Sequence, residues 1–139
     1  LQPDEFAAHH QLGQLMLRLD RPADAIAYFD KAIQHNPTFA EAMRQLAWIY
    51  ATHARQDLRD AAQAVRLAER ACELTDYVDP NNLDTLARVH YQRGEIEMAV
   101  TIQQQAIEIA PEAEVETYRK SLVKYQEALA EVESPAGTP

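Results

Sequence analysis

Apolar side chains recur at spacings of three and four residues along most of this chain, as they do on one face of a helix. Runs that alternate between apolar and polar residues, which would indicate strands, do not stand out. Residues typical of turns divide the pattern into seven parts. We therefore predict helices at about residues 4–19, 22–35, 39–53, 60–75, 81–93, 95–109 and 112–132.

Proline, glycine and aspartate residues support several of these helix ends. Pro22 suits the first turn of a helix, where its missing N–H group costs no hydrogen bond. Pro37 and Pro111 disfavour helical geometry in the residue before them, so the preceding helices should end there. Gly94 lies at an expected tight turn, and Asp60 is a suitable N-cap for the helix that follows it.

The pattern also repeats. Leu12-Gly13 returns as Leu46-Ala47 after 34 residues and as Leu86-Ala87 after 40 more. Downstream, three matching sets follow: Ala25, Phe29, Ala32 and Pro37, then Ala64, Ala68, Ala71 and Asp76, then Ala99, Gln103, Ala106 and Pro111. Each copy predicts two helices that approach closely over small side chains. Larger residues should fill the space between them: Leu12, Met16, Phe29, Leu46, Tyr50 and Leu86.

The order Leu-Gly-x-x-Met, then Ala-x-x-x-Phe-x-x-Ala-x-x-x-x-Pro, resembles the tetratricopeptide repeat, which has a period of 34 residues. The resemblance covers residues 6 to about 113 and implies an all-α fold, a right-handed α-solenoid of about seven helices in antiparallel pairs. Repeats are expected at about 6–39, 40–79 and 80–113, with an insertion at 52–60 stretching the second. The family's signature tryptophan is replaced at three positions, by His9, Met43 and Leu83.

The last predicted helix, residues 112–132, reads as a capping helix. Its apolar residues lie at three- and four-residue spacing, and its charged residues fit a solvated face. A solenoid needs such a cap because its last repeat would otherwise expose an apolar side. The repeat domain is therefore expected to span residues 1–132, followed by a disordered tail at 133–139.

Charge and composition exclude several classes of protein. The formal net charge of −9 argues against binding to nucleic acid or to an anionic membrane, because both carry negative charge. No apolar stretch reaches the roughly 20 residues of a membrane span, so this fragment should not insert directly. The chain begins without methionine, which suggests a piece of a longer protein. A cytoplasmic location is favoured, and a periplasmic one fits if the full-length protein is anchored or exported.

The family resemblance also implies the binding surface. In tetratricopeptide proteins the first helix of each pair lines a concave groove that takes a protein segment, either an extended peptide or a helix. The matching residues here are His10, Gln14, Arg18, Arg44, Gln45, Trp48, Asp84, Arg88, Tyr91 and Gln92. Arginines there would favour an acidic segment, because guanidinium groups pair with carboxylates. Alternatively, Arg44 and Arg88 only pair with Glu41 and Asp84 on their own helices.

The sequence also bears on a carboxylate clamp in the groove, on the role of Trp48 and on the single cysteine. The carboxylate clamp of chaperone co-factors is not expected, because none of its matching positions holds lysine or arginine: His10, Gln14, Gln45, Asn81 and Thr85. Trp48, the one tryptophan, either anchors a partner or packs against the 52–60 insertion. Cys72 is expected to be a small, half-buried core residue rather than a reactive thiol.

No enzyme motif, cofactor or metal is expected. No two histidines have the i, i+4 spacing of helix-borne metal ligands, and no phosphate-binding loop or nucleophile elbow occurs. We predict a protein-interaction module. Two alternatives remain: an accessory domain of a larger bacterial enzyme, either membrane-anchored or free, or a self-associating assembly domain. Self-association would use the apolar stripe of the last helix, Tyr118, Leu122, Tyr125 and Leu129.

Overall fold

The structure, a computed structural model, describes residues 5–134. This part of the chain forms seven α-helices and two short 3-10 helices, η1 (Gln56–Leu58) and η2 (Glu112–Glu114), and contains no strand. The α-helices are α1 (Glu5–Arg18), α2 (Pro22–His35), α3 (Ala40–Thr52), α4 (Ala61–Leu74), α5 (Pro80–Gln92), α6 (Ile96–Ile109) and α7 (Val115–Glu133). The prediction of an all-α fold with about seven helices is confirmed.

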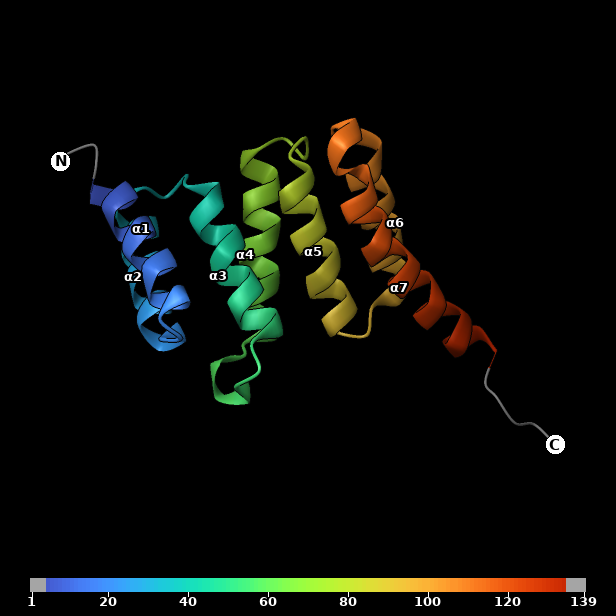
Figure 1. Ribbon diagram of the computed structural model, residues 1–139, viewed down its shortest axis with the longest axis horizontal. Coiled ribbons are helices and arrows are strands. Elements are labelled where there is room, and N and C mark those ends of the chain that lie inside the picture. Colours follow the sequence, from blue (N-terminus) through green and yellow to red (C-terminus); the bar gives the residue numbers. More distant parts are fainter. Residues whose placement is uncertain (1–4, 135–139) are drawn as a thin grey trace.

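The helices pack in adjacent pairs. Helix α1 packs on α2, α3 on α4 and α5 on α6, and each pair also contacts the next through α2 with α3 and α4 with α5. Figure 1 shows the pairs in chain order along the long axis of the molecule, with α7 at the C-terminal end. Within residues 5–134, every helix is too short or too polar to cross a bilayer.

Small residues hold the pairs together, as the sequence predicts. The repeated alanines are completely buried: Ala25, Ala32, Ala64, Ala71, Ala99 and Ala106. Phe29 is also fully buried and packs with Met16 and Leu46. The prediction was wrong for Leu12, which is 37% exposed. It lies on the outward side of α1, where residues 5–134 supply no further helix to cover it.

The capping and turn residues lie at the helix ends where the sequence predicts them. The side chain of Asp60 accepts a hydrogen bond from the backbone N–H of Gln63, which is the expected cap of α4. Pro22 occupies the first turn of α2. Gly94, between α5 and α6, has a φ angle of 81°, a conformation that glycine adopts without strain.

Helix α7 differs from the predicted cap in its ends and in its contacts. It starts at Val115 after η2, rather than at residue 112, and reaches Glu133. Glu133 is thus helical, and residues 135–139 of the predicted tail lie outside the described residues. Tyr118 and Tyr125 are only 5% and 1% exposed, so the apolar stripe is not open for self-association.

Tyrosine contacts place α7 against α5. The Tyr118 hydroxyl donates to Oδ1 of Asn81 over 2.8 Å. Further along, the Tyr125 ring stacks on Tyr91 with the centroids 4.7 Å apart. Helix α7 packs on α6, as α3 packs on α2 and α5 packs on α4. It therefore takes the place of a first helix in a fourth pair and continues the row formed by α3 and α5 (Figure 1).

Candidate functional site

Trp48 of α3 lies at the centre of the candidate site. Its side chain is 41% exposed, which is unusual for a residue that normally buries most of its area. The guanidinium carbon of Arg88, on α5, lies over the indole ring, 4.3 Å from the centroid. Such a cation–π contact fixes the exposed face of Trp48 and joins two consecutive repeats.

A recess of about 340 Å³ opens beside Trp48, between α1 and α3. Its lining is formed by Leu17, Arg44, Gln45 and Trp48. Leu17 was not among the predicted residues, although the repeat spacing could have found it. It lies 34 positions before Ala51 and 74 before Tyr91, a predicted groove residue. We call the set Leu17, Arg44, Gln45, Trp48 and Arg88 the Trp48 surface.

Both predicted intrahelical ion pairs are present at this surface. Arg44 lies 4.0 Å from Glu41, and Arg88 lies 3.6 Å from Asp84. The distance between Arg44 and Glu41 is at the limit for a salt bridge, and the Glu41 side chain is about half exposed. This ion pair therefore contributes little stability. Arg44 therefore keeps most of its capacity to bind another carboxylate.

A buried amide holds the partner of Arg88 in place. Gln103 of α6 is fully buried, and its Nε2 donates to Oδ1 of Asp84 over 2.8 Å and to the backbone carbonyl of Tyr118 over 2.9 Å. Arg88 donates in turn to Ser121 of α7 over 3.4 Å. Asp84, Arg88 and α7 are thus linked, and Arg88 is oriented before any partner arrives. Sequence reasoning missed Gln103 because its position matches the core residue Phe29.

Tyr91 extends the surface toward α7. Its ring stacks on the buried Tyr125, and the ammonium group of Lys124 lies 4.9 Å from its centroid. Burial raises the pKa of the Tyr125 hydroxyl to about 12, so it stays neutral. Lys124 thus adds a cation at the Tyr91 ring, although it was predicted to lie on the solvated face of the cap.

Four other predicted residues, His10, Gln14, Arg18 and Gln92, do not line the recess beside Trp48. His10 is only 7% exposed, donates to Oε1 of Gln45 over 3.0 Å and packs on Phe39, so it serves the contact between repeats. Gln14 is half-buried, and Arg18 is exposed at the end of α1. Gln92 lines a separate recess with Arg59, Arg93 and residues of α3 and α4.

The contacts of Trp48 also bear on its alternative role. Its backbone carbonyl accepts a hydrogen bond from Thr52, at the start of the predicted insertion. Its ring, however, lies under Arg88 and lines the recess with Leu17. The ring of Trp48 is therefore part of the recess between α1 and α3.

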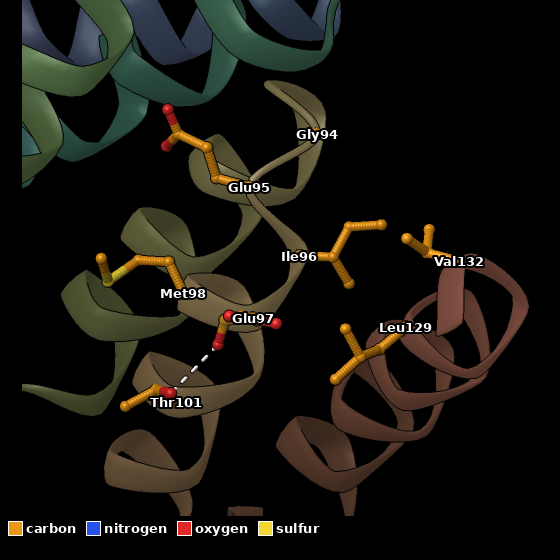
Figure 2. A pocket seen from close by; sticks show the side chains of 8 residues that line it. All are labelled: Gly94, Glu95, Ile96, Glu97, Met98, Thr101, Leu129 and Val132. Carbon is orange, nitrogen blue, oxygen red and sulfur yellow. Dashed lines mark hydrogen bonds between the residues drawn. The ribbon is translucent and has the colours of Figure 1, made fainter. Parts of the chain in front are cut away.

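A larger cleft, of about 510 Å³, lies at the far end of the molecule between the start of α6 and the last turns of α7. Figure 2 shows Ile96 pointing toward Leu129 and Val132 across it, whereas Met98 and Glu95 point the other way. None of the predicted residues lines this cleft. Its lining combines the apolar residues Ile96, Met98, Leu129 and Val132 with Glu95, Glu97 and Thr101.

Cys72 is fully buried, more than the half-buried position predicted, and burial chiefly raises the pKa of its thiol to about 12. Among residues 5–134, no group of three or more histidine, cysteine, aspartate and glutamate side chains could hold a metal ion.

Comparison with known proteins gives the family. Residues 6–39 and residues 83–113 each match a family model described as a tetratricopeptide repeat. The chain carries tetratricopeptide repeats. The two matches fall on α1 with α2 and on α5 with α6, the first and third pairs of the fold. Tetratricopeptide-repeat domains are in general protein-interaction modules.

One solved structure agrees with this repeat fold. A crystal structure of MamA aligns with a TM-score of 0.65 at 22% identity, over 94% of this chain and 83% of that one. A MamA fragment from residue 41 to the end, from Desulfovibrio magneticus RS-1, gives a TM-score of 0.43 at 14% identity, over 96% and 100% of the two chains. No curated protein matches the sequence. The likeness to the first structure concerns the arrangement of helices.

Proposed function

We propose that the Trp48 surface binds a segment of a partner protein, either an extended peptide or one face of a helix. The observation that carries the proposal is the exposed Trp48 ring held under the Arg88 guanidinium. Tryptophan and arginine dominate the binding energy of protein interfaces, most of all where they are fixed in advance. The tetratricopeptide repeats support this, because the first helices of such repeats commonly face a ligand.

The chemistry of the surface favours a segment in which an apolar residue lies near an acidic one. Leu17 and Trp48 form the apolar part of a recess of about 340 Å³. Arg44 stands at its edge with a weak intrahelical pair, and Lys124 adds a nearby cation. An acidic segment would meet these cations although the whole chain carries a net charge of −9, because a local cluster sets the local potential.

Selection of random peptides displayed on phage tests the proposal. Bound peptides should be enriched in aspartate or glutamate next to a large apolar residue. Trp48 is the one tryptophan of the chain, so its fluorescence reports directly whether a selected peptide contacts the surface. We expect the emission of Trp48 to shift on titration with such a peptide.

A matched pair of variants isolates the role of Arg44. Arg44→Glu should weaken binding of the selected peptide at least about 10-fold, as expected for an interface arginine. Arg70→Glu is the control, because Arg70 is an exposed arginine of α4 that also makes an i, i+3 pair, with Glu73. Both variants change the net charge equally. Equal loss in both, or binding without any change in Trp48 emission, would contradict the proposal.

A further inference from the structure

The outward side of α1 carries a stripe of exposed apolar residues. Leu12 and Leu15 are each 37% exposed, and Leu19, directly after the helix, is 56% exposed. Ala8, one turn earlier, is exposed as well. The four residues follow one another at spacings of four, three and four, which is the spacing of the seam between two paired helices. We call Ala8, Leu12, Leu15 and Leu19 the α1 stripe.

The later repeats show what covers this face of a first helix. Leu46 and Ile49 of α3, which match Leu12 and Leu15, are 1% and 2% exposed because they pack on residues of α2. Leu86 and Val89 of α5 are 5% and 1% exposed because they pack on α4. The face is therefore built to bury itself against a helix. Among residues 5–134, no helix takes that place on α1.

The other end of the molecule is a poor match for the α1 stripe. The exposed side of α7 carries charged residues along most of its length, among them Glu116, Lys120, Lys124 and Glu127. A head-to-tail contact between two copies would remove these charges from water without pairing them, which is costly. A second α1 stripe has no such cost and offers the same apolar seam.

Charges at the two ends of α1 specify an orientation. Glu5 lies in the first turn and Arg18 in the last turn of this 14-residue helix, which is about 21 Å long. Glu5 also lies 3.2 Å from His35 of α2, but its side chain is still about half exposed. In an antiparallel pair, Arg18 of each copy comes near Glu5 of the other, and the helix dipoles also oppose one another. A parallel pair would bring like charges together. A two-fold axis near Leu12 would bring the two α1 stripes together and would also place Arg18 of each copy near Glu5 of the other.

We propose that this protein forms a two-fold dimer in which the α1 stripes of two copies pack antiparallel. The proposal is independent of the Trp48 surface. A single short helix buries less than the usual 800 Å² or so of each partner, so we expect a dissociation constant on the order of 100 μM.

Sedimentation velocity across a dilution series, from about 5 μM to about 1 mM, brackets that constant. The unmodified protein should shift from monomer to dimer over this range. Leu15→Lys should raise the dissociation constant at least about 30-fold, because it places a cation in the seam of both copies. Val123→Lys is the matched control: Val123 is an apolar residue of α7, is 47% exposed, and belongs to neither the α1 stripe nor the Trp48 surface. It should leave the dimer unchanged.

Charge exchange tests the antiparallel arrangement. Arg18→Glu should weaken the dimer about 3- to 10-fold by placing two acidic groups together, and adding Glu5→Lys should restore it. Far-UV circular dichroism checks that each variant keeps its helices. A protein that stays monomeric at the highest concentration, or associates equally well in Leu15→Lys, overturns the proposal. A loss in Arg18→Glu that Glu5→Lys does not repair overturns the antiparallel orientation. Leu15→Lys should still bind the selected peptides, which separates this result from the proposed function.

Discussion

The close contact between Gly13 of α1 and Phe29 of α2 makes a quantitative prediction about the first helix pair. A Cβ atom added at Gly13 would lie 2.6 Å and 2.7 Å from two atoms of the Phe29 ring. Carbon atoms normally approach no closer than about 3.5 Å, so the ring would have to move by nearly 1 Å. Phe29 is fully buried between Met16 and Leu46, so it has little room to do so.

Two opposing effects decide the outcome of Gly13→Ala. Alanine favours a helix interior over glycine by about 1 kcal/mol. Overpacking a fixed core costs about 1–3 kcal/mol, and the upper end applies here because the neighbour is a buried ring rather than a flexible chain end. We therefore expect Gly13→Ala to lower the free energy of unfolding by about 2 kcal/mol, or the melting temperature by roughly 6–10 °C.

Urea denaturation followed by circular dichroism measures this change, and a double mutant identifies its cause. Phe29→Leu alone should cost about 1–2 kcal/mol, but Gly13→Ala added to it should cost nothing more, because the clash is gone. Gly94→Ala is the control: it is destabilising through its φ of 81° and has no atom within 4 Å of the new Cβ, so Phe29→Leu cannot rescue it. A Gly13→Ala protein as stable as the parent would refute the reasoning.

Three further predictions concern other parts of the chain. Gln103→Leu removes both donors to Asp84 and to the Tyr118 carbonyl and should lower the free energy of unfolding by about 2–4 kcal/mol in urea denaturation; no change would disprove the network. Cys72 should react with an aromatic disulfide reagent only after unfolding, since burial raises the pKa of its thiol to about 12; rapid labelling of the native protein would contradict this. Glu95 has a pKa below its ordinary 4.5, chiefly through its hydrogen bond with His90. The stabilisation from this hydrogen bond is therefore present above pH 4.5 and is lost as the pH falls through the folded-state pKa of Glu95. The difference in melting temperature between the parent and Glu95→Gln should thus shrink at acid pH. A difference that stays constant with pH would contradict the prediction.

The helices and their pairing were predictable from the sequence because they depend on local rules. Proline at a first turn, aspartate as an N-cap and apolar spacing by three and four residues act within a few positions of the chain. The alignment of Ala25, Ala64 and Ala99 predicted the buried contacts within pairs, because a repeated small residue marks a repeated close approach. Even Asp60 was placed correctly as the cap of α4.

The candidate groove residues were also predicted from residue type and repeat position, but these two features could not show which of the residues lie together. His10 and Trp48 both fell on the expected groove, yet one is buried and the other is exposed. The reason is that side-chain exposure depends on the neighbours supplied by other helices. The contact between Trp48 and Arg88, 40 positions apart, is set by how α3 and α5 lie beside one another.

The ends of the row of helices depend most on tertiary structure. Leu12 carries the same pattern as Leu46 and Leu86, but within residues 5–134 only the latter two have a preceding helix to cover them. Tyr118 and Tyr125 look like an open stripe in the sequence and are buried because α7 packs on α6 and its tyrosines reach α5. The sequence by itself determined which residues form helices and which faces are apolar. The tertiary structure alone decided which apolar faces are covered, because coverage depends on where the neighbouring helices lie.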